Sequence, residues 1–382
     1  MKQGWEIKKL GEVATILNGY AFDSKLFSED SNDMPLIRIR DIKRGYTETF
    51  YKGDFSDEYI IKKGDYLIGM DGEFNIAEWK GNDALLNQRV CKIVANDIVD
   101  RYLFWYMPVV LKQIEDATPF VTVKHLSSKQ LINTNIPVPP REEQERIVAE
   151  LDCLSGVIEK KREQLKELDA LAQSIFYQMF GDPITNEKGW EVKKLGEVCT
   201  INPQKKEATT IVDITDEVSF LPMEDLSIKA CYIQPKQSRT FSEVQASYTY
   251  FKDGDVLLAK VSPCFENGKI GIAQNLINGI GFGSSEYIVF RLDTSVLKEY
   301  LYFFLQDATF VEEATKNLTG TSGLRRVPKS FVENRIIGIP PLTLQQEFAD
   351  KIEAIEKQKE LIKESIKETE TLFNARMDYY FN

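Results

Sequence analysis

Histidine and cysteine are scarce in this sequence of 382 residues, which contains one histidine, His125, and five cysteines. The cysteines are Cys91, Cys153, Cys199, Cys231 and Cys264. They are widely spaced, odd in number and never arranged as CxxC, so neither a metal cluster nor a disulfide framework is expected. We predict reduced and mostly buried thiols. One histidine is also too few for an ordinary histidine-based zinc site or a Ser-His-Asp triad.

Long apolar runs are missing as well. No tract of about 18 apolar residues predicts a membrane span. The opening "MKQGWEIKKLGEV" has no apolar stretch before a cleavage site, which argues against a secretory signal. We therefore expect a cytoplasmic protein.

Nucleotide-binding and nuclease motifs are weak. No GxxxxGK[ST] loop is present, and "GIGFG" at 279–283 does not match GxGxxG. Asp71, Glu78 and Lys80 could in principle hold a metal and activate water, but the second half of the chain does not keep their spacing. The sequence favours a protein that binds or organises, with no catalytic residues and no metal or cofactor of its own.

Excess positive charge is also lacking, since the net charge is −11. An acidic chain is not typical of a nucleic-acid-binding protein. Basic residues nevertheless gather locally in "RIRDIKR" at 38–44, "VKHLSSK" at 123–129 and "LRRVPK" at 324–329.

What the sequence does have is a long internal repeat. "GWEIKKLGEVATI" begins at Gly4, and "GWEVKKLGEVCTI" begins at Gly189 with 11 of 13 positions identical. A second shared passage, "IPVPPREEQERIVAELD" from 136 and "IGIPPLTLQQEFADKIE" from 337, follows each divergent stretch. Two long copies indicate a duplicated domain rather than a solenoid. Trp5 and Trp190 would be equivalent docking anchors.

The segments after each Pro-Pro pair are rich in Glu, Lys, Gln and Leu, and apolar residues recur in them with a mean spacing of 3.5 residues, which predicts a coiled coil. The predicted seam consists of Ile147, Leu151, Leu154, Ile158, Leu165, Leu168, Ile175, Met179, Phe348, Ile352, Ile355, Ile362, Ile366 and Phe373. The second helix also places Lys359, Thr369 and Arg376 in its seam, so we expect it to be the less stable of the two.

The fold class predicted from these features is α+β. Two pseudo-twofold-related globular α/β domains, with mainly antiparallel or curled sheets, are expected at 1–140 and 181–341. Helices at 141–180 and 342–382 are expected to form an antiparallel coiled coil of about 60 Å that separates the domains. Asn382 would then arrive beside Met1.

Duplex DNA is an extended partner that suits two different domains on a spacer, because its half-sites repeat about every 34 Å. Arginine can contact guanine, asparagine and glutamine can contact adenine, and lysine can contact phosphates. The candidate DNA-binding residues are Arg38, Arg40, Lys43, Arg44, Asn87, Gln88, Arg89, Lys124, His125, Lys260, Lys269, Ser284, Arg325, Arg326 and Lys329. Charged residues facing solvent are the plainer explanation for any single one of them.

The repeated "GWEIKKLGEV", the "IPVPPREEQERIVAELD" passage and "MFGDP" before the second "GW" together resemble the specificity subunit of type I restriction-modification systems. The resemblance covers essentially the whole chain. It implies that each globular domain is a target-recognition domain for one half of a split DNA sequence. It also implies two methyltransferase subunits with S-adenosylmethionine, and restriction subunits that use ATP and Mg²⁺.

Two other interpretations stay open at this stage. The chain could be a self-contained nuclease that uses Asp71, Glu78 and Lys80, or a structural adaptor whose variable domains ignore DNA. The bases read, the gap length and the oligomeric state without partners do not follow from the sequence.

Overall fold

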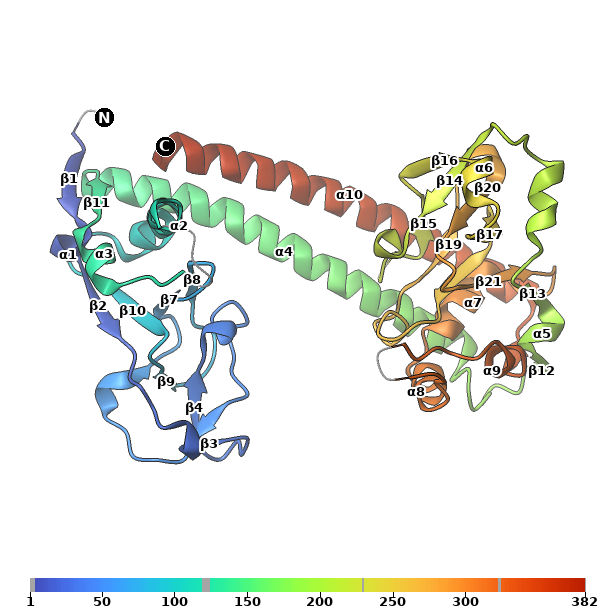
Figure 1. Cartoon of the computed structure of the whole chain (residues 1–382), viewed down its shortest axis with the longest axis horizontal. Helices are drawn as coiled ribbons and strands as arrows, with labels where there is room; N and C mark the ends of the chain where they lie inside the picture. Colours follow the sequence, from blue (N-terminus) through green and yellow to red (C-terminus); the bar gives the residue numbers. More distant parts are fainter. Residues whose placement is uncertain (1–3, 119–123, 229, 322–323, 382) are drawn as a thin grey trace. The chain divides into compact units, whose positions relative to one another are not determined.

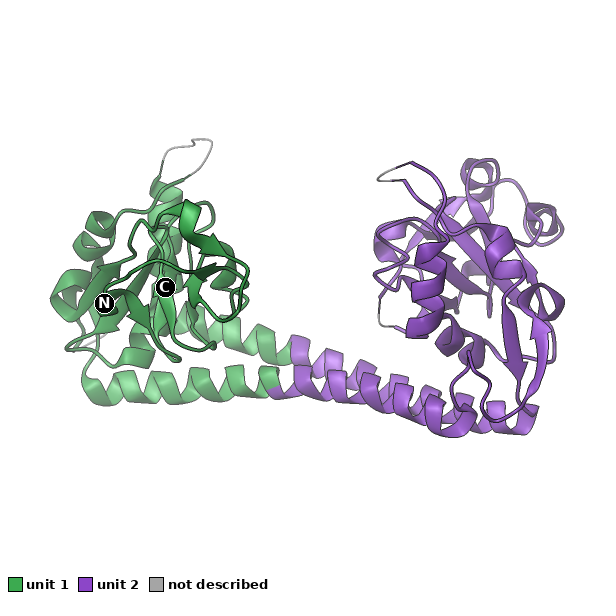
Figure 2. Ribbon diagram, turned by 90° about the horizontal axis from the view of Figure 1, so that it is seen from below, with its two compact units in different colours: residues 1–159, 368–382 green, residues 160–367 purple. Residues whose placement is uncertain are grey.

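The computed structural model describes residues 4–118, 124–228, 230–321 and 324–381, and the chain divides into two compact units (Figure 2). Unit 1 comprises residues 1–159 and 368–382, and unit 2 comprises residues 160–367. Each unit therefore contains one globular part and a portion of both long helices. The predicted division into two recognition domains and two separate helices stays a prediction.

The strands of unit 1 form a short ribbon and two sheets (Figure 1). In the ribbon, β1 (Glu6–Lys9) pairs antiparallel with β11 (Asn135–Val138). The first sheet has the order β2-β10-β7-β8, formed by β2 (Ala14–Asn18), β10 (Val90–Ala95), β7 (Tyr66–Gly69) and β8 (Asn75–Glu78). The second sheet has the order β3-β5-β4-β9-β6, formed by β3 (Phe27–Ser28), β5 (Phe50–Tyr51), β4 (Met34–Ile37), β9 (Ala84–Leu86) and β6 (Ile60–Ile61).

The helices of unit 1 are α1 (Leu10–Val13), α2 (Asp100–Ala117) and α3 (Ser128–Asn133), with single 3₁₀ turns η1 (Ser24–Leu26), η2 (Ile39–Asp41) and η3 (Asp57–Tyr59). The apolar face of α2 enters the main core of the unit, where Tyr102, Leu103 and Val110 are fully buried beside Ile68 and Cys91 of the sheet. The aromatic run "DRYLFWYM" at 100–107 is therefore helical.

Unit 2 repeats this plan, with five strands in its first sheet and four in its second. Its ribbon pairs β12 (Glu191–Lys194) with β22 (Ile336–Ile339). One sheet has the order β13-β21-β18-β19-β15, formed by β13 (Cys199–Ile201), β21 (Tyr287–Leu292), β18 (Val256–Ala259), β19 (Ile270–Ala273) and β15 (Tyr232–Ile233). The other has the order β16-β14-β20-β17, formed by β16 (Gln237–Thr240), β14 (Glu217–Leu221), β20 (Ile280–Gly283) and β17 (Thr249–Lys252).

The shorter helices of unit 2 are α5 (Leu195–Val198), α6 (Phe241–Val244), α7 (Lys298–Leu305), α8 (Ala308–Lys316) and α9 (Lys329–Glu333), with 3₁₀ segments η4 (Lys205–Thr210), η5 (Met223–Asp225) and η6 (Ile277–Gly279). Most described strand pairs of both units are antiparallel, and β4 with β9, β14 with β20 and β15 with β19 are parallel. The predicted mixed fold with mainly antiparallel sheets is confirmed.

The two long helices are α4 (Arg141–Phe180) and α10 (Leu342–Phe381), and they pack together (Figure 1). Their direction follows from contacts inside each unit. In unit 1, Arg376 Nη2 donates to Glu150 Oε2 at 2.9 Å, and in unit 2, Lys359 Nζ lies 2.7 Å from Asp169 Oδ1. Residue numbers rise along α4 as they fall along α10, so the pair is antiparallel, as predicted.

Every predicted seam residue is at least partly covered. Those buried are Ile147, Leu151, Ile158, Phe348, Ile352, Ile355 and Ile366. Those partly buried are Leu154, Leu165, Leu168, Ile175, Met179, Ile362 and Phe373. The ends of the seam also belong to the cores of the globular parts, because Ile147 joins the main core of unit 1 and Phe348 that of unit 2. The helices are thus built into each unit as well as against each other.

Two aromatic residues of this seam were not predicted. Phe176 and Phe180 are buried and lie 5.6 Å and 5.2 Å from Phe348, measured between ring centroids. Their spacing of four residues places them on one face of α4. The predicted heptad had assigned this stretch to Ile175 and Met179 instead.

Two polar seam residues of the second helix, Lys359 and Arg376, have partners on the first. Lys359 is only 4% exposed and contacts Asp169 at 2.7 Å and Glu356 at 2.6 Å. Arg376 pairs with Glu150, which also accepts a hydrogen bond from Tyr380. The lower stability of the second helix stays a prediction, and these ion pairs connect its polar residues to the first helix.

The repeated opening docks on a helix end, as predicted for Trp190. Its indole Nε1 donates to the carbonyl oxygen of Phe180 at 3.0 Å, and Lys188 Nζ donates to that of Gln178 at 2.8 Å. Both groups satisfy carbonyls that the last turn of α4 leaves without helical partners. Trp5 packs against the unit 1 core that contains Phe381. The predicted meeting of Met1 and Asn382 lies outside the described residues.

A pair of equivalent glutamines, unnoticed in the sequence, fixes the start of each long helix. Gln144 accepts a hydrogen bond from Val99 N at 2.7 Å and donates to Pro139 O at 2.8 Å. Gln345 accepts from Leu297 N at 2.7 Å and donates to Pro340 O at 2.8 Å. Each amide thus ties its helix to the Pro-Pro segment and to the globular part.

Within the described residues, no helix is long and apolar enough to cross a membrane.

Candidate nucleic-acid interface

The candidate residues of unit 1 meet around Asp71, just beyond the end of β7. Arg89, which precedes β10, places Nε 3.2 Å and Nη1 3.4 Å from the Asp71 carboxylate. His125 Nδ1 lies 2.6 Å from Asp71 Oδ1. We call Asp71, Arg89 and His125 the Asp71 cluster. The side chains of Arg89 and His125 are 55% and 59% exposed, so both lie at the surface above a more covered carboxylate.

The corresponding place in unit 2 holds Glu286 and Arg326, which we call the Glu286 cluster. Arg326 donates two hydrogen bonds of 2.8 Å to the Glu286 carboxylate, and its Nη1 donates to Leu324 O at 2.9 Å. The guanidinium lowers the pKa of Glu286 below its ordinary value, because it favours the charged carboxylate. A bidentate pair of this kind has a fixed geometry.

Backbone pairing shows that the two clusters occupy equivalent positions. His125 forms an antiparallel bridge with Asp71, two residues after β7, and Arg326 forms one with Val261, two residues after β18. The structure thus brings Lys124 and His125 of unit 1 and Arg325 and Arg326 of unit 2 to the same place in their units. Their chemistry differs, however, because Arg89 in unit 1 is replaced by Glu286 in unit 2.

Most other candidates of unit 1 are held by their own unit. Lys43 Nζ lies 3.0 Å from Glu73, and Lys124 Nζ donates to Glu115 O at 2.7 Å. Asn87 Oδ1 accepts from Gln88 N at 2.8 Å, and Arg40 Nη2 contacts Thr49 Oγ1 at 3.5 Å. Arg38, Arg44 and the Gln88 side chain are exposed at the surface.

The remaining candidates of unit 2 also include residues bound by their own unit and one exposed residue. Lys260 Nζ donates to Ser285 O at 2.8 Å, and Lys269 Nζ donates to Met223 O at 2.7 Å. Ser284 Oγ accepts from Glu286 N at 3.2 Å, and Lys329 pairs with Glu333 at 3.0 Å. Arg325 is exposed, and no side-chain partner is found for it among the described residues. Several predicted contacts are thus already engaged in holding loops together.

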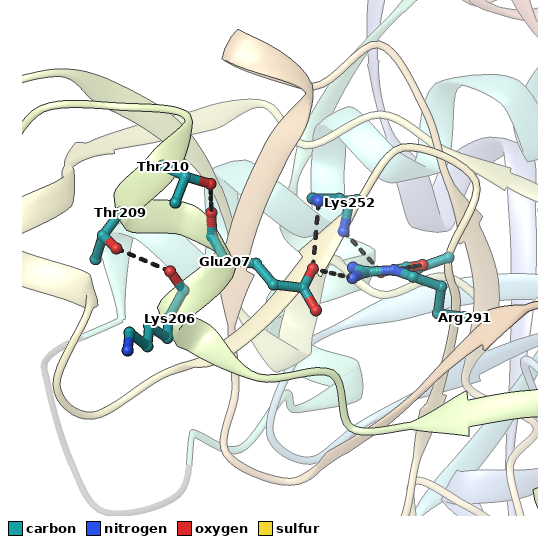
Figure 3. A network of polar contacts seen from close by, with 7 residues as sticks. Lys206, Glu207, Thr209, Thr210, Lys252 and Arg291 are labelled. Carbon is teal, nitrogen blue, oxygen red and sulfur yellow. Dashed lines mark hydrogen bonds and ion pairs between the residues drawn. The ribbon is translucent and has the colours of Figure 1, made fainter.

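A further polar network in unit 2 was missed by the sequence analysis (Figure 3). Asp255, which is 2% exposed, accepts two hydrogen bonds from Arg291 at 2.9 Å and 2.6 Å. Glu207 of η4 joins it by pairing with Arg291 and with Lys252, the latter at 3.2 Å. The network fixes η4 on the sheet, while the side chain of Lys206 extends away from it (Figure 3). The shared "GD" of the repeat, Asp65 in unit 1 and Asp255 in unit 2, was the available signal.

The three residues of the nuclease hypothesis have separate partners. Asp71 is engaged by Arg89 and His125, whereas Glu78 accepts a hydrogen bond from Arg101 Nη1 at 2.9 Å. Lys80 Nζ lies 3.9 Å from Glu159. Across the described ranges, no group of three His, Cys, Asp or Glu side chains is placed to hold a metal ion.

The five cysteines are unpaired. Cys91, Cys199 and Cys231 are buried, Cys264 is partly buried and Cys153 is exposed. Burial raises the pKa of Cys91 to about 12, because a thiolate would lose its hydration there. The mostly buried thiols agree with the sequence prediction.

Comparison with known proteins finds the same family in both copies of the repeat. The family model for the type I restriction modification DNA specificity domain matches residues 2–170 and again residues 187–371. The chain belongs to this family. The two matches cover both copies of the repeat.

Among its relatives, the specificity subunit of the Escherichia coli type I restriction enzyme EcoBI is 28% identical over 388 residues, covering 92% of this chain and 79% of the relative. The fold resembles that of the S subunit of a type I restriction-modification system from M. genitalium, with a TM-score of 0.53, 11% identity and coverage of 98% and 95% of the two chains. A chain from a structural study of complex assembly in a type I system also has a TM-score of 0.53, with 20% identity and coverage of 100% and 98%. The α+β fold and the membership of the specificity-subunit family predicted from the sequence are confirmed.

Proposed function

We propose that this chain selects a bipartite DNA sequence, each unit reading one half-site. The observation that carries the proposal is that the same fold occurs in both units, with different exposed side chains at equivalent positions. The Asp71 cluster presents Arg89 and His125, whereas the Glu286 cluster closes Arg326 onto a carboxylate. Two domains with a shared fold and different exposed groups suit two different half-sites.

The proposal extends to the partners of the chain. Two methyltransferase subunits, which hold S-adenosylmethionine, would methylate adenines in the selected sequence, and restriction subunits would use ATP and Mg²⁺ to cleave unmodified DNA. The specificity chain itself supplies no catalytic residue in this scheme, and the complex acts in the cytoplasm. Because the net charge of −11 opposes binding to phosphates, we expect tight DNA binding only in the complex.

Methylation mapping tests the proposal. Genomic DNA from cells that express the chain with its methyltransferase subunits should carry methyladenine in one bipartite motif with a constant gap. Cells that lack only this chain should lose the methylation. A complex that assembles but methylates without sequence preference would contradict the proposal and would favour a structural adaptor.

A further inference from the structure

Arg89 in unit 1 is oriented by a carboxylate and still exposed. Asp71 engages Nε and Nη1 of the guanidinium at 3.2 Å and 3.4 Å. The Asp71 side chain is 21% exposed, so the carboxylate is more covered than the 55% exposed arginine. Among the described residues, no partner is found for Nη2. One edge of the planar fork is therefore fixed by the protein, and the other edge is available to a ligand.

Three segments that meet at this point are joined through the backbone. Met70 N donates to Arg89 O at 3.0 Å, and Leu126 N donates to Met70 O at 2.8 Å. Gly72 N donates to Lys124 O at 3.0 Å. The backbone on both sides of Asp71 and the backbone of Arg89 are thus held by hydrogen bonds before any ligand arrives. A group fixed in this way loses less conformational entropy on binding.

The turn that carries Arg89 has the shape of an exposed tip. Asn87 accepts hydrogen bonds from Gln88 N at 2.8 Å through its side chain and from Val90 N at 2.9 Å through its carbonyl. Tyr20 forms a backbone bridge with Asn87 and is 52% exposed. Arg89 therefore lies in an exposed turn next to Gln88, whose amide is a group that contacts bases in DNA complexes.

The chemistry of this tip selects one base. A planar guanidinium with two free donors at its end matches the N7 and O6 acceptors of guanine in the major groove, and no other base presents two acceptors there. Phosphate binding would need no orienting carboxylate, and Asp71 would repel a phosphate. The arrangement therefore favours a base contact over a backbone contact.

The equivalent position of unit 2 has the opposite charge. The residue before β21 is Glu286 in place of arginine, and Arg326 binds it with two hydrogen bonds of 2.8 Å. We infer that Arg89, positioned by Asp71, reads a guanine in the half-site contacted by unit 1, an inference that rests on the proposed function. The guanine requirement carried by this position belongs to one half-site only.

The test compares the full complex with wild-type chain, Arg89→Ala and Arg141→Ala. Arg141 is the matched control, because it is an exposed arginine of unit 1 held by one carboxylate, Glu145, at 3.0 Å. Arg89→Ala should relax one guanine position in one half of the mapped motif and lower methylation of the original sequence on the order of 10- to 100-fold. Arg141→Ala should leave the motif unchanged. A motif unchanged by Arg89→Ala would overturn the inference.

A second measurement needs no variant and covers the case in which Arg89→Ala does not fold. Duplexes with 7-deazaguanine at each guanine of the half-site in turn lack the N7 acceptor. Binding of the wild-type complex should fall about tenfold at one position, and inosine, which keeps N7 and O6, should bind normally there. If 7-deazaguanine has no effect at any guanine of either half-site, Arg89 does not read guanine. A wild-type complex without any bipartite motif would instead refute the proposed function itself.

The role of Asp71 gives a separate readout. Asp71→Asn removes a negative charge, so binding to random duplex should stay equal or become tighter, while discrimination at the guanine position should fall several-fold. If Asp71 had a purely structural role, Asp71→Asn would weaken both the binding to random duplex and the discrimination at the guanine position. That result would contradict the assignment of Asp71 as the positioning residue.

Discussion

At the scale of single residues, buried amides connect the globular parts to the long helices. Gln345 is 0% exposed, and its two polar atoms satisfy the N–H of Leu297 and the carbonyl of Pro340. Gln144 repeats the arrangement in unit 1 with Val99 and Pro139. A buried backbone group without a partner is costly, so these side chains are not replaceable by apolar residues of similar size.

We predict that Gln345→Leu lowers the free energy of unfolding by about 1–3 kcal/mol, because it strands a buried N–H and a buried carbonyl. Gln346→Leu is the control, since Gln346 is exposed at the next position and donates a hydrogen bond to Asp350 at 2.8 Å. It should change stability by less than about 0.5 kcal/mol. Chemical denaturation of both variants measures the difference. Equal losses of unfolding free energy would show that the buried amide contacts of Gln345 do not stabilise the fold.

At the scale of elements, the helix pair combines an apolar seam with two polar clusters. One cluster joins Lys359 to Asp169 and Glu356 in unit 2, and the other joins Arg376 and Tyr380 to Glu150 in unit 1. Buried ion pairs add little net stability compared with apolar packing, but removing one partner is strongly destabilising. Their role is best understood as fixing which residues of the two helices face each other.

For Lys359→Met we expect a loss of about 3 kcal/mol or more in unfolding free energy, because Glu356 would be left buried without its cation. The double variant Lys359→Met with Glu356→Met should recover much of that loss. Lys357→Met, at a position 73% exposed, is the control and should be nearly neutral. Thermal and urea unfolding of the three variants provide the comparison. A single variant as stable as the wild type would show that water reaches the cluster.

The cluster around Glu150 predicts a pH dependence. Hydrogen bonds from Arg376 and Tyr380 lower the pKa of Glu150 from its ordinary value of 4.5. A lowered folded-state pKa contributes stability that is present above pH 4.5 and is lost as the pH falls through the folded value. The stability difference between wild type and Glu150→Gln should therefore be largest near neutral pH and shrink below pH 4.5. Glu145→Gln controls for the loss of an exposed charge, and a difference that stays constant with pH would contradict the assignment.

At the scale of the whole molecule, the second helix belongs to both units. Phe348, Ile352 and Ile355 complete the core of unit 2, and Tyr380 and Phe381 complete that of unit 1. Removing residues 345–382 should expose Phe176, Phe180, Ile147 and Leu151 and prevent assembly with the methyltransferase subunits. Co-purification with these subunits measures this outcome. A truncated chain that assembles normally would argue against the helix pair as a required element.

The length of the helices gives the last prediction. Seven residues inserted in each helix keep the heptad phase and add about 10 Å, which corresponds to about three base pairs. If the helices set the spacing, the gap in the methylated motif should lengthen while both half-sites stay the same. The same mapping experiment reads the gap directly, and an unchanged gap would exclude this role.

The sequence by itself determined the duplication, the mixed fold and the two long helices, because all three depend on local periodicity and on similarity between two stretches of one chain. It did not determine which charged residues are available to a ligand. Lys124, Lys269 and Arg326 appear among the candidates by charge and position, yet their side chains are bound to a carbonyl or a carboxylate of their own unit. The pairing of Arg89 with Asp71 likewise joins residues 18 positions apart. Only the tertiary structure decides such pairings, because they depend on how strands from distant parts of the chain meet. The charge of a residue does not indicate which other residue will lie beside it.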